Sequence, residues 1–219
     1  MRQSLSPGLV PQLPLKEDIR AALHVLARSW RRDGSKADLR SVDLYGWIAG
    51  EADFTGANMR RAQLQSAALS RAGLQHAQLQ GADLSDAVLS DAFLSDALLP
   101  DAVLNRAQLQ GTCLRRANLR GALLKEAKLN GAHLQGADLH SADLQDADLT
   151  RADLDRAKLA DVFMLNVGQV CSANVYDSTE LRAALASDPD VRSRIAACEE
   201  ARAQGKPPPD ADPTQFWAS

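Results

Sequence analysis

The feature that most constrains this chain is a five-residue repeat that runs without insertion from Ala37 to Met164. The first position of each pentad is Ala in 22 of 26 cases, and the third is Leu in 22 of 26, so chance does not explain the pattern. On an α-helix, residues five apart are separated by about 140° around the axis, and the leucines would share no face. On a strand, the first and third residues point to one side and the middle residue points away. The repeat therefore predicts short strands with Ala and Leu inward.

The fourth and fifth residues of each pentad are often Gly, Ser, Asp, Asn or Arg, which suits a turn. Residues 81–85 (GADLS) and 136–140 (GADLH) show the whole unit. In these residues the chain resembles the bacterial pentapeptide-repeat family, whose motif is A(D/N)LXX. The resemblance implies an all-β solenoid, a right-handed quadrilateral β-helix with four pentads per coil and about 6.5 coils.

The inward leucines are predicted to fill the axis of this solenoid, where each stabilises the fold by about 1.5–3 kcal/mol when buried. The central part of this structural core is predicted to consist of Leu79, Leu84, Leu89, Leu94, Leu99, Leu104, Leu109 and Leu114.

A stacked solenoid exposes strand edges at its ends, so both ends need a cover. Before the repeat, Ile19, Leu23, Leu26 and Trp30 recur at helical spacing and predict an amphipathic helix over the first coil. The predicted organisation is a flexible N-terminus (1–14), a capping helix (15–36), the β-helix (37–164), a helical cap or dimerisation segment (165–205) and a flexible tail (206–219).

Beyond Met164 the sequence favours helices. Asp177 and Glu180 form a pattern typical of a capping box, and Asp188 followed by Pro189 predicts the start of a second helix. These helices either cap the solenoid or join two copies into a homodimer through the C-terminal end. The protein is thus predicted to be a monomer or such a homodimer.

Residues twenty apart are predicted to stack on one wall, so neighbours on the surface can be inferred from their sequence numbers. The corner position is acidic in four successive pentads, at Asp86, Asp91, Asp96 and Asp101. Stacking predicts ion pairs between coils, joining Arg106 to Asp86, Arg116 to Asp96 and Arg71 to Asp91. These pairs either balance charge within the fold or form a charged band that a partner recognises.

The outward middle position is usually polar, but one coil carries Val88, Phe93, Leu98 and Val103 there, and Leu123 stacks beyond Val103. One interpretation is ordinary tolerance of scattered apolar side chains on strands. The other is a protein-binding belt centred on Phe93 and Leu98.

The sequence offers no chemistry that would indicate an enzyme. Its four histidines are dispersed, and we predict no catalytic residue, cofactor or metal. Cys113, Cys171 and Cys198 form no disulfide framework, and no apolar run reaches the roughly 20 residues of a membrane helix. We therefore expect a cytoplasmic protein that contacts no membrane.

Two functions remain open. The first is a non-catalytic scaffold that presents a rigid surface to a protein partner. The second follows from the resemblance, because some pentapeptide-repeat proteins bind DNA gyrase by imitating a duplex and give resistance to gyrase poisons. A duplex mimic needs extended negative charge, whereas the repeat holds 17 acids against 13 bases. With a net charge of −3, direct binding of nucleic acid is not expected.

Overall fold

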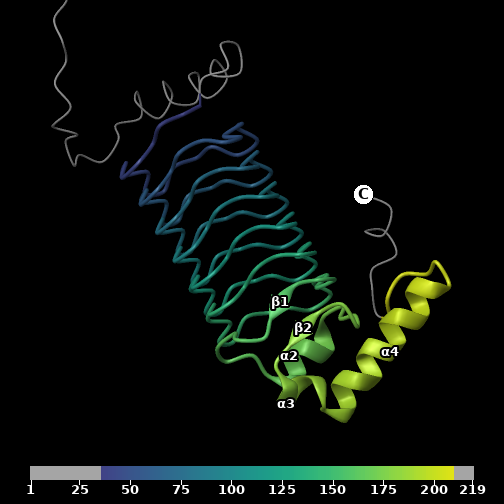
Figure 1. Ribbon diagram of the computed structural model, residues 1–219. Helices are drawn as coiled ribbons and strands as arrows, with labels where there is room; N and C mark the ends of the chain where they lie inside the picture. The colour runs from purple at the N-terminus through teal and green to yellow at the C-terminus, as the bar shows by residue number, and fades with distance from the viewer. Residues whose placement is uncertain (1–35, 210–219) are drawn as a thin grey trace, which may run out of the picture.

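The computed structural model describes residues 36–209. The predicted flexible N-terminus, nearly all of the predicted capping helix and residues 210–219 lie outside the described residues. The described chain forms a long stack of parallel coils, and the C-terminal helices lie at its far end (Figure 1).

Parallel bridges join each middle residue to the residue twenty positions later, from Asp38↔Asn58 to Asp143↔Phe163. The backbone hydrogen bonds follow the same register, as when Leu39 N donates to Asn58 O at 2.7 Å. Because four bridging positions fall within each twenty residues, the solenoid has four walls. We number them by their residues: wall 1 contains Asp38 and Leu98, wall 2 Asp43 and Val103, wall 3 Ile48 and Val88, and wall 4 Asp53 and Phe93.

The corners have a left-handed backbone, which the residue types at these positions did not predict. The fifth residue of every pentad from Ser41 to Arg156 has a φ between 55° and 69°. Only seven of these 24 positions are Gly, although side chains usually disfavour this region. The left-handed conformation persists because the backbone N–H of the fifth residue donates to the next coil, as from Ser41 N to Arg60 O at 2.9 Å.

Ala and Leu face inward along the whole stack. The eight leucines of the predicted structural core have exposed fractions of 0–1%. Thr112 occupies an Ala position, and its buried hydroxyl donates to Leu89 O at 2.8 Å. The polar atom is therefore satisfied within an apolar core. In the first coil, Trp47 and Phe54 are buried with ring centroids 5.1 Å apart.

The outward Asp residues hold the corners. Within residues 36–209 the N–H of the fourth residue takes no part in the ladder, and where an Asp stands two positions earlier, its carboxylate accepts from this N–H. Asp43 Oδ1 accepts from Tyr45 N at 3.0 Å, and Asp148 Oδ1 accepts from Thr150 N at 3.0 Å. The preference for Asp or Asn at the middle position thus has a local physical cause.

The chain continues the ladder beyond the predicted end of the repeat. Helix α2 (Val167–Ser172) begins with a capping box formed by Asn166 and Gln169. Asn174 then bridges Asp153, and strand β2 (Glu180–Leu181) pairs with β1 (Lys158–Leu159).

The capping box predicted at Asp177 and Glu180 is therefore wrong, because Glu180 belongs to a strand that pairs with the preceding coil. Helix α3 (Ala183–Ala186) follows. Helix α4 (Pro189–Ala203) starts where predicted, with Asp188 Oδ1 accepting from Asp190 N at 2.9 Å.

Side chains of this segment bind main-chain carbonyls of the last repeats. Gln169 Nε2 donates to Leu144 O at 2.8 Å and to Ala147 O at 3.0 Å. The Thr179 hydroxyl donates to Leu154 O at 2.8 Å. These bonds satisfy acceptors that a bare strand edge would leave unpaired.

The apolar residues at the end of the repeat are only partly covered. Val162 and Leu165 are buried, whereas Phe163 and Met164 are 60% and 66% exposed. Among residues 36–209, no helix has the length and apolar character needed to cross a membrane.

Candidate interaction surface

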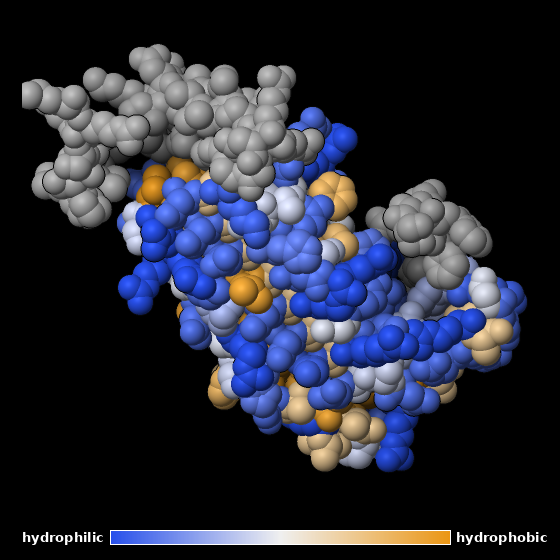
Figure 2. Space-filling model, turned by 45° about the horizontal axis from the view of Figure 1, so that its top comes forward, coloured by the Kyte–Doolittle hydropathy of each residue, from blue (hydrophilic) through white to orange (hydrophobic). Residues whose placement is uncertain are grey.

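The four apolar residues of the predicted belt lie on four different walls. Val88 is on wall 3, Phe93 on wall 4, Leu98 on wall 1 and Val103 on wall 2, so Phe93 and Val103 face in opposite directions. The face shown in Figure 2 is mostly hydrophilic, with apolar residues in small separate groups. A single flat partner could not contact the whole belt.

A smaller apolar group crosses one corner, and we call it the Leu98–Leu123 patch. It consists of Leu98 on wall 1, Pro100 at the corner, and the bridged pair Val103 and Leu123 on wall 2. Leu98 is 37% exposed and Leu123 is 42% exposed. At most corners the N–H of the fourth residue needs an acceptor, which an Asp two positions earlier can supply. Pro100 has no N–H, so Leu98 can replace that Asp without leaving a donor unpaired. These residues therefore form an apolar group that extends over two adjoining walls.

Phe93 forms a separate feature on wall 4. It is 48% exposed and lies in the ladder between Gly73 and Cys113. The Cys113 sulfur is 3.1 Å from the Ser95 hydroxyl, and the thiol is free and half-buried.

The four acidic corner residues fall into two kinds. Asp86 accepts two hydrogen bonds from Arg106 at 2.8 and 2.7 Å, as the stacking predicted. Asp96 is bound by Arg116 in the same way, at 2.8 and 2.6 Å. The hydrogen bond from each arginine lowers the pKa of its aspartate. These two carboxylates therefore have fixed positive partners.

Asp91 and Asp101 differ because the residues stacked above them are Gly111 and Gly121. Their carboxylates lean over these glycines, where an added Cβ would collide with them. The predicted pair between Arg71 and Asp91 is wrong, since Arg71 pairs with Glu51 at 3.1 Å. Among the described residues, two members of the acidic ring are thus paired with arginines, and two are not.

Wall 4 also stacks Cys113, His133 and Asp153 in one column. Burial lowers the pKa of His133 and raises the pKa of Asp153. Asp153 accepts from Gln135 Nε2 at 2.7 Å and from Asp155 N at 3.1 Å, so both its oxygens are in structural contacts. Within residues 36–209, no group of three or more His, Cys, Asp or Glu side chains could hold a metal ion.

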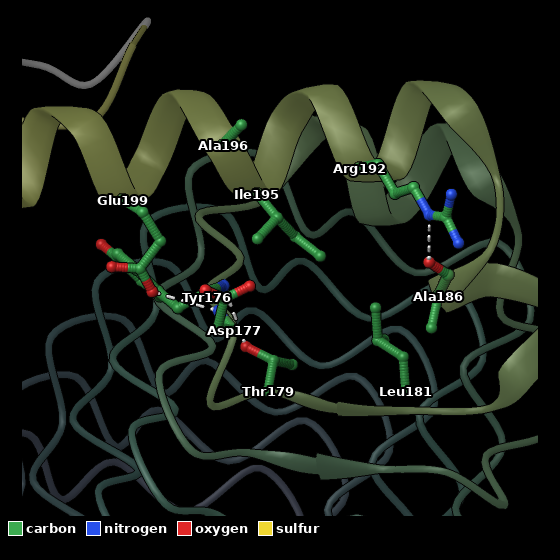
Figure 3. A pocket seen from close by; sticks show the side chains of 9 residues that line it. All are labelled: Tyr176, Asp177, Thr179, Leu181, Ala186, Arg192, Ile195, Ala196 and Glu199. Carbon is green, nitrogen blue, oxygen red and sulfur yellow. Dashed lines mark hydrogen bonds between the residues drawn. The ribbon is translucent and has the colours of Figure 1, made fainter.

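A groove that the sequence did not predict lies between α4 and the segment that contains β2 and α3 (Figure 3). Its volume is about 410 Å³, and Leu181 and Ile195 point into it. At one end, Arg192 Nε donates to Ala186 O at 3.3 Å. At the other end, Glu199 Oε1 accepts from Asp177 N at 3.1 Å. The groove therefore has an apolar floor between a basic end and an acidic end.

Comparison with known families gives a direct result. The model of pentapeptide repeats matches in eight copies, over residues 37–75, 50–86, 82–121 and 117–156. These matches span more than half of the chain. The protein belongs to the pentapeptide-repeat family, and its fold is a right-handed β-helix solenoid.

Several solved structures are similar. HetL, a pentapeptide-repeat protein involved in heterocyst differentiation regulation in the cyanobacterium Nostoc, is 34% identical over 59% of this chain and 67% of its own, with a TM-score of 0.34. A protein of the Arabidopsis thaliana thylakoid lumen is 23% identical over 66% and 82%, with a TM-score of 0.40. Trypsin-treated QnrB1, a plasmid-mediated fluoroquinolone resistance protein, is 18% identical over 74% and 89%, with a TM-score of 0.39. No curated protein sequence matches the chain.

Proposed function

We propose that this protein is a non-catalytic scaffold that binds a protein partner through the Leu98–Leu123 patch. The observation that carries the proposal is the exposure of two leucines, at 37% and 42%, on adjoining walls with a proline at the corner between them. A leucine side chain that is desolvated at a well-packed contact contributes strongly to binding. The continuous ladder holds the backbone beneath these side chains in place, so little backbone conformational freedom is lost when a partner binds.

The ends of the solenoid limit where a partner can bind. We propose that residues 165–205 cap the last coil, because Gln169 and Thr179 bind its carbonyls and β2 extends its ladder. We expect residues 15–36 to cap the exposed strand edges of the first coil in the same way. With both edges covered, the walls are the surface that remains for a partner.

A variant on the patch tests this function. The double substitution of Leu98→Ser and Leu123→Ser removes the apolar contact while the inward core stays intact. Val88→Ser is the matched control, since Val88 lies on wall 3, opposite Leu98. We expect a partner captured by the parent protein to be lost with the double variant and retained with the control. Equal capture by all three proteins would show that the patch is not the site.

The second candidate, a gyrase-binding duplex mimic, is less well supported by the charges. Asp86 and Asp96 are bound by arginines, and the repeat from Ala37 to Met164 holds 17 acids against 13 bases. A mimic would need free negative charge along its length. A DNA supercoiling assay with gyrase, with and without a quinolone, separates the two functions. Inhibition or rescue from the drug at low protein concentration would establish the gyrase function, and no effect is the result that the scaffold proposal expects.

A further inference from the structure

We propose that the groove between α4 and the β2–α3 segment is the docking site of this chain's own Phe216 and Trp217. The groove is lined by Tyr176, Asp177, Thr179, Leu181, Ala186, Arg192, Ile195, Ala196 and Glu199. The groove contains no residue of the Leu98–Leu123 patch, so this inference is independent of the proposed function.

The course of the chain after α4 brings these residues to the groove. Gly205 has a φ of +63° and reverses the chain, and Lys206 N donates back to Ala201 O at 2.9 Å. Pro209 O then accepts from Arg194 Nη1 and Nη2, each at 3.2 Å. From Ala201 to Arg194 the helix axis advances about 10 Å. Three proline-rich residues in extended form also advance about 10 Å, so residues 206–209 run back along α4 toward its first turn.

The length of chain beyond Pro209 is sufficient. Phe216 is seven residues farther, which allows a reach of about 23 Å. Half the circumference of a helix about 11 Å wide is roughly 17 Å. A chain that leaves at Arg194 can therefore pass around α4 and place Phe216 and Trp217 between Leu181 and Ile195, whose side chains point into the groove.

Charge favours the same path. Asp210 and Asp212 come directly after Pro209, one and three residues on. Arg192 lies at the basic end of the groove, about 3 Å along the axis from Arg194. Only Arg192 Nε has a hydrogen-bond partner among the described residues, which leaves the terminal guanidinium nitrogens for a carboxylate. The two aromatic side chains would then cover the apolar floor.

The test uses the full chain labelled with 5-fluorotryptophan and a soluble paramagnetic quencher. Three ¹⁹F signals arise, from Trp30, Trp47 and Trp217, and a Trp217→Phe variant assigns the third. Ala196→Phe fills the groove, because Ala196 lies in its lining. Ser193→Phe is the matched control, because Ser193 is exposed on α4 outside that lining.

We expect quencher broadening of the Trp217 signal to rise several-fold with Ala196→Phe and with Arg192→Glu, and to stay at the parent value with Ser193→Phe. The buried Trp47 signal reports that each variant is folded. Equal broadening of Trp217 in parent and Ala196→Phe proteins would overturn the proposal. Protection that depends on protein concentration would also overturn it, because it would place the aromatic pair in a second copy.

Discussion

The guanidinium carbon of Arg202 lies 4.1 Å from the centre of the Tyr176 ring, at the junction between α4 and the solenoid. The same guanidinium pairs with Asp155 at 2.7 Å. Asp155 also accepts a short hydrogen bond from Ser178. One arginine thus connects the helix to both the last regular coil and the irregular segment that follows it. Burial around Tyr176 raises the pKa of its phenol, so the ring stays neutral at physiological pH.

Arg202→Ala should loosen α4 without unfolding the solenoid. The change removes a cation–π contact worth about 0.5–2 kcal/mol together with the ion pair. Hydrogen exchange of α4 amides should become faster, while amides in the central coils keep their protection. Arg202→Lys keeps the charge, so the exchange rate of its α4 amides should lie between the rates of the parent and of Arg202→Ala. Unchanged exchange in α4 with Arg202→Ala would show that other contacts hold the helix.

Leu104→Ala should destabilise the whole stack. Leu104 is 1% exposed, and truncation of a buried leucine costs about 2–5 kcal/mol. Leu104→Met conserves volume and should cost less than about 1.5 kcal/mol. Urea unfolding of both variants measures the difference. A Leu104→Ala protein as stable as the parent would contradict a tightly packed core.

Asp148→Ala should remove the hydrogen bond to Thr150 N, at a cost of about 1 kcal/mol. Asp148→Asn keeps the accepting oxygen and should restore most of the loss. If Asp148→Asn and Asp148→Ala lower the free energy of unfolding equally in urea, the charge of Asp148 contributes more to stability than its hydrogen bond to Thr150 N does.

His133 should make stability depend on pH. Burial lowers its folded pKa below the ordinary 6.5, so the unfolded chain takes up a proton first as the pH falls. The free energy of unfolding should therefore decrease as the pH drops through 6.5. His133→Gln should flatten this part of the curve, measured by urea unfolding between pH 5 and 8. An identical pH dependence in both proteins would assign the effect to other groups.

Deletion of residues 1–35 should expose the first coil. Leu44, Trp47 and Phe54 are at most 1% exposed although no described coil precedes them, and Trp47 Nε1 is buried with no hydrogen-bond partner among residues 36–209. In a Trp30→Phe and Trp217→Phe background, we expect the shortened protein to associate in a concentration-dependent manner, with red-shifted Trp47 fluorescence. Deletion of residues 1–14 is the control and should change neither property. A monomeric protein with unchanged Trp47 emission after the longer deletion would show that residues 15–35 do not cover this end.

The five-residue period alone predicted the inward core, because a strand is the arrangement in which Ala and Leu share a side. The parallel register of twenty residues followed from the resemblance to the pentapeptide-repeat family, which implies four pentads per coil. This register also predicted two of the ion pairs between coils, Arg106 with Asp86 and Arg116 with Asp96. Both pairs follow from the twenty-residue coil that the family resemblance implies, because no insertion shifts the register between Ala37 and Met164.

Tertiary structure alone decided the features that do not repeat. Asn174 and β2 continue the ladder at spacings of 21 and 22 residues, which no periodic pattern signals. The left-handed corners are imposed by hydrogen bonds to the next coil, so arginine and aspartate occupy positions that local preference would give to glycine. The four walls separate Phe93 from Val103, because each corner redirects the chain. Outward side chains of successive pentads therefore face different directions.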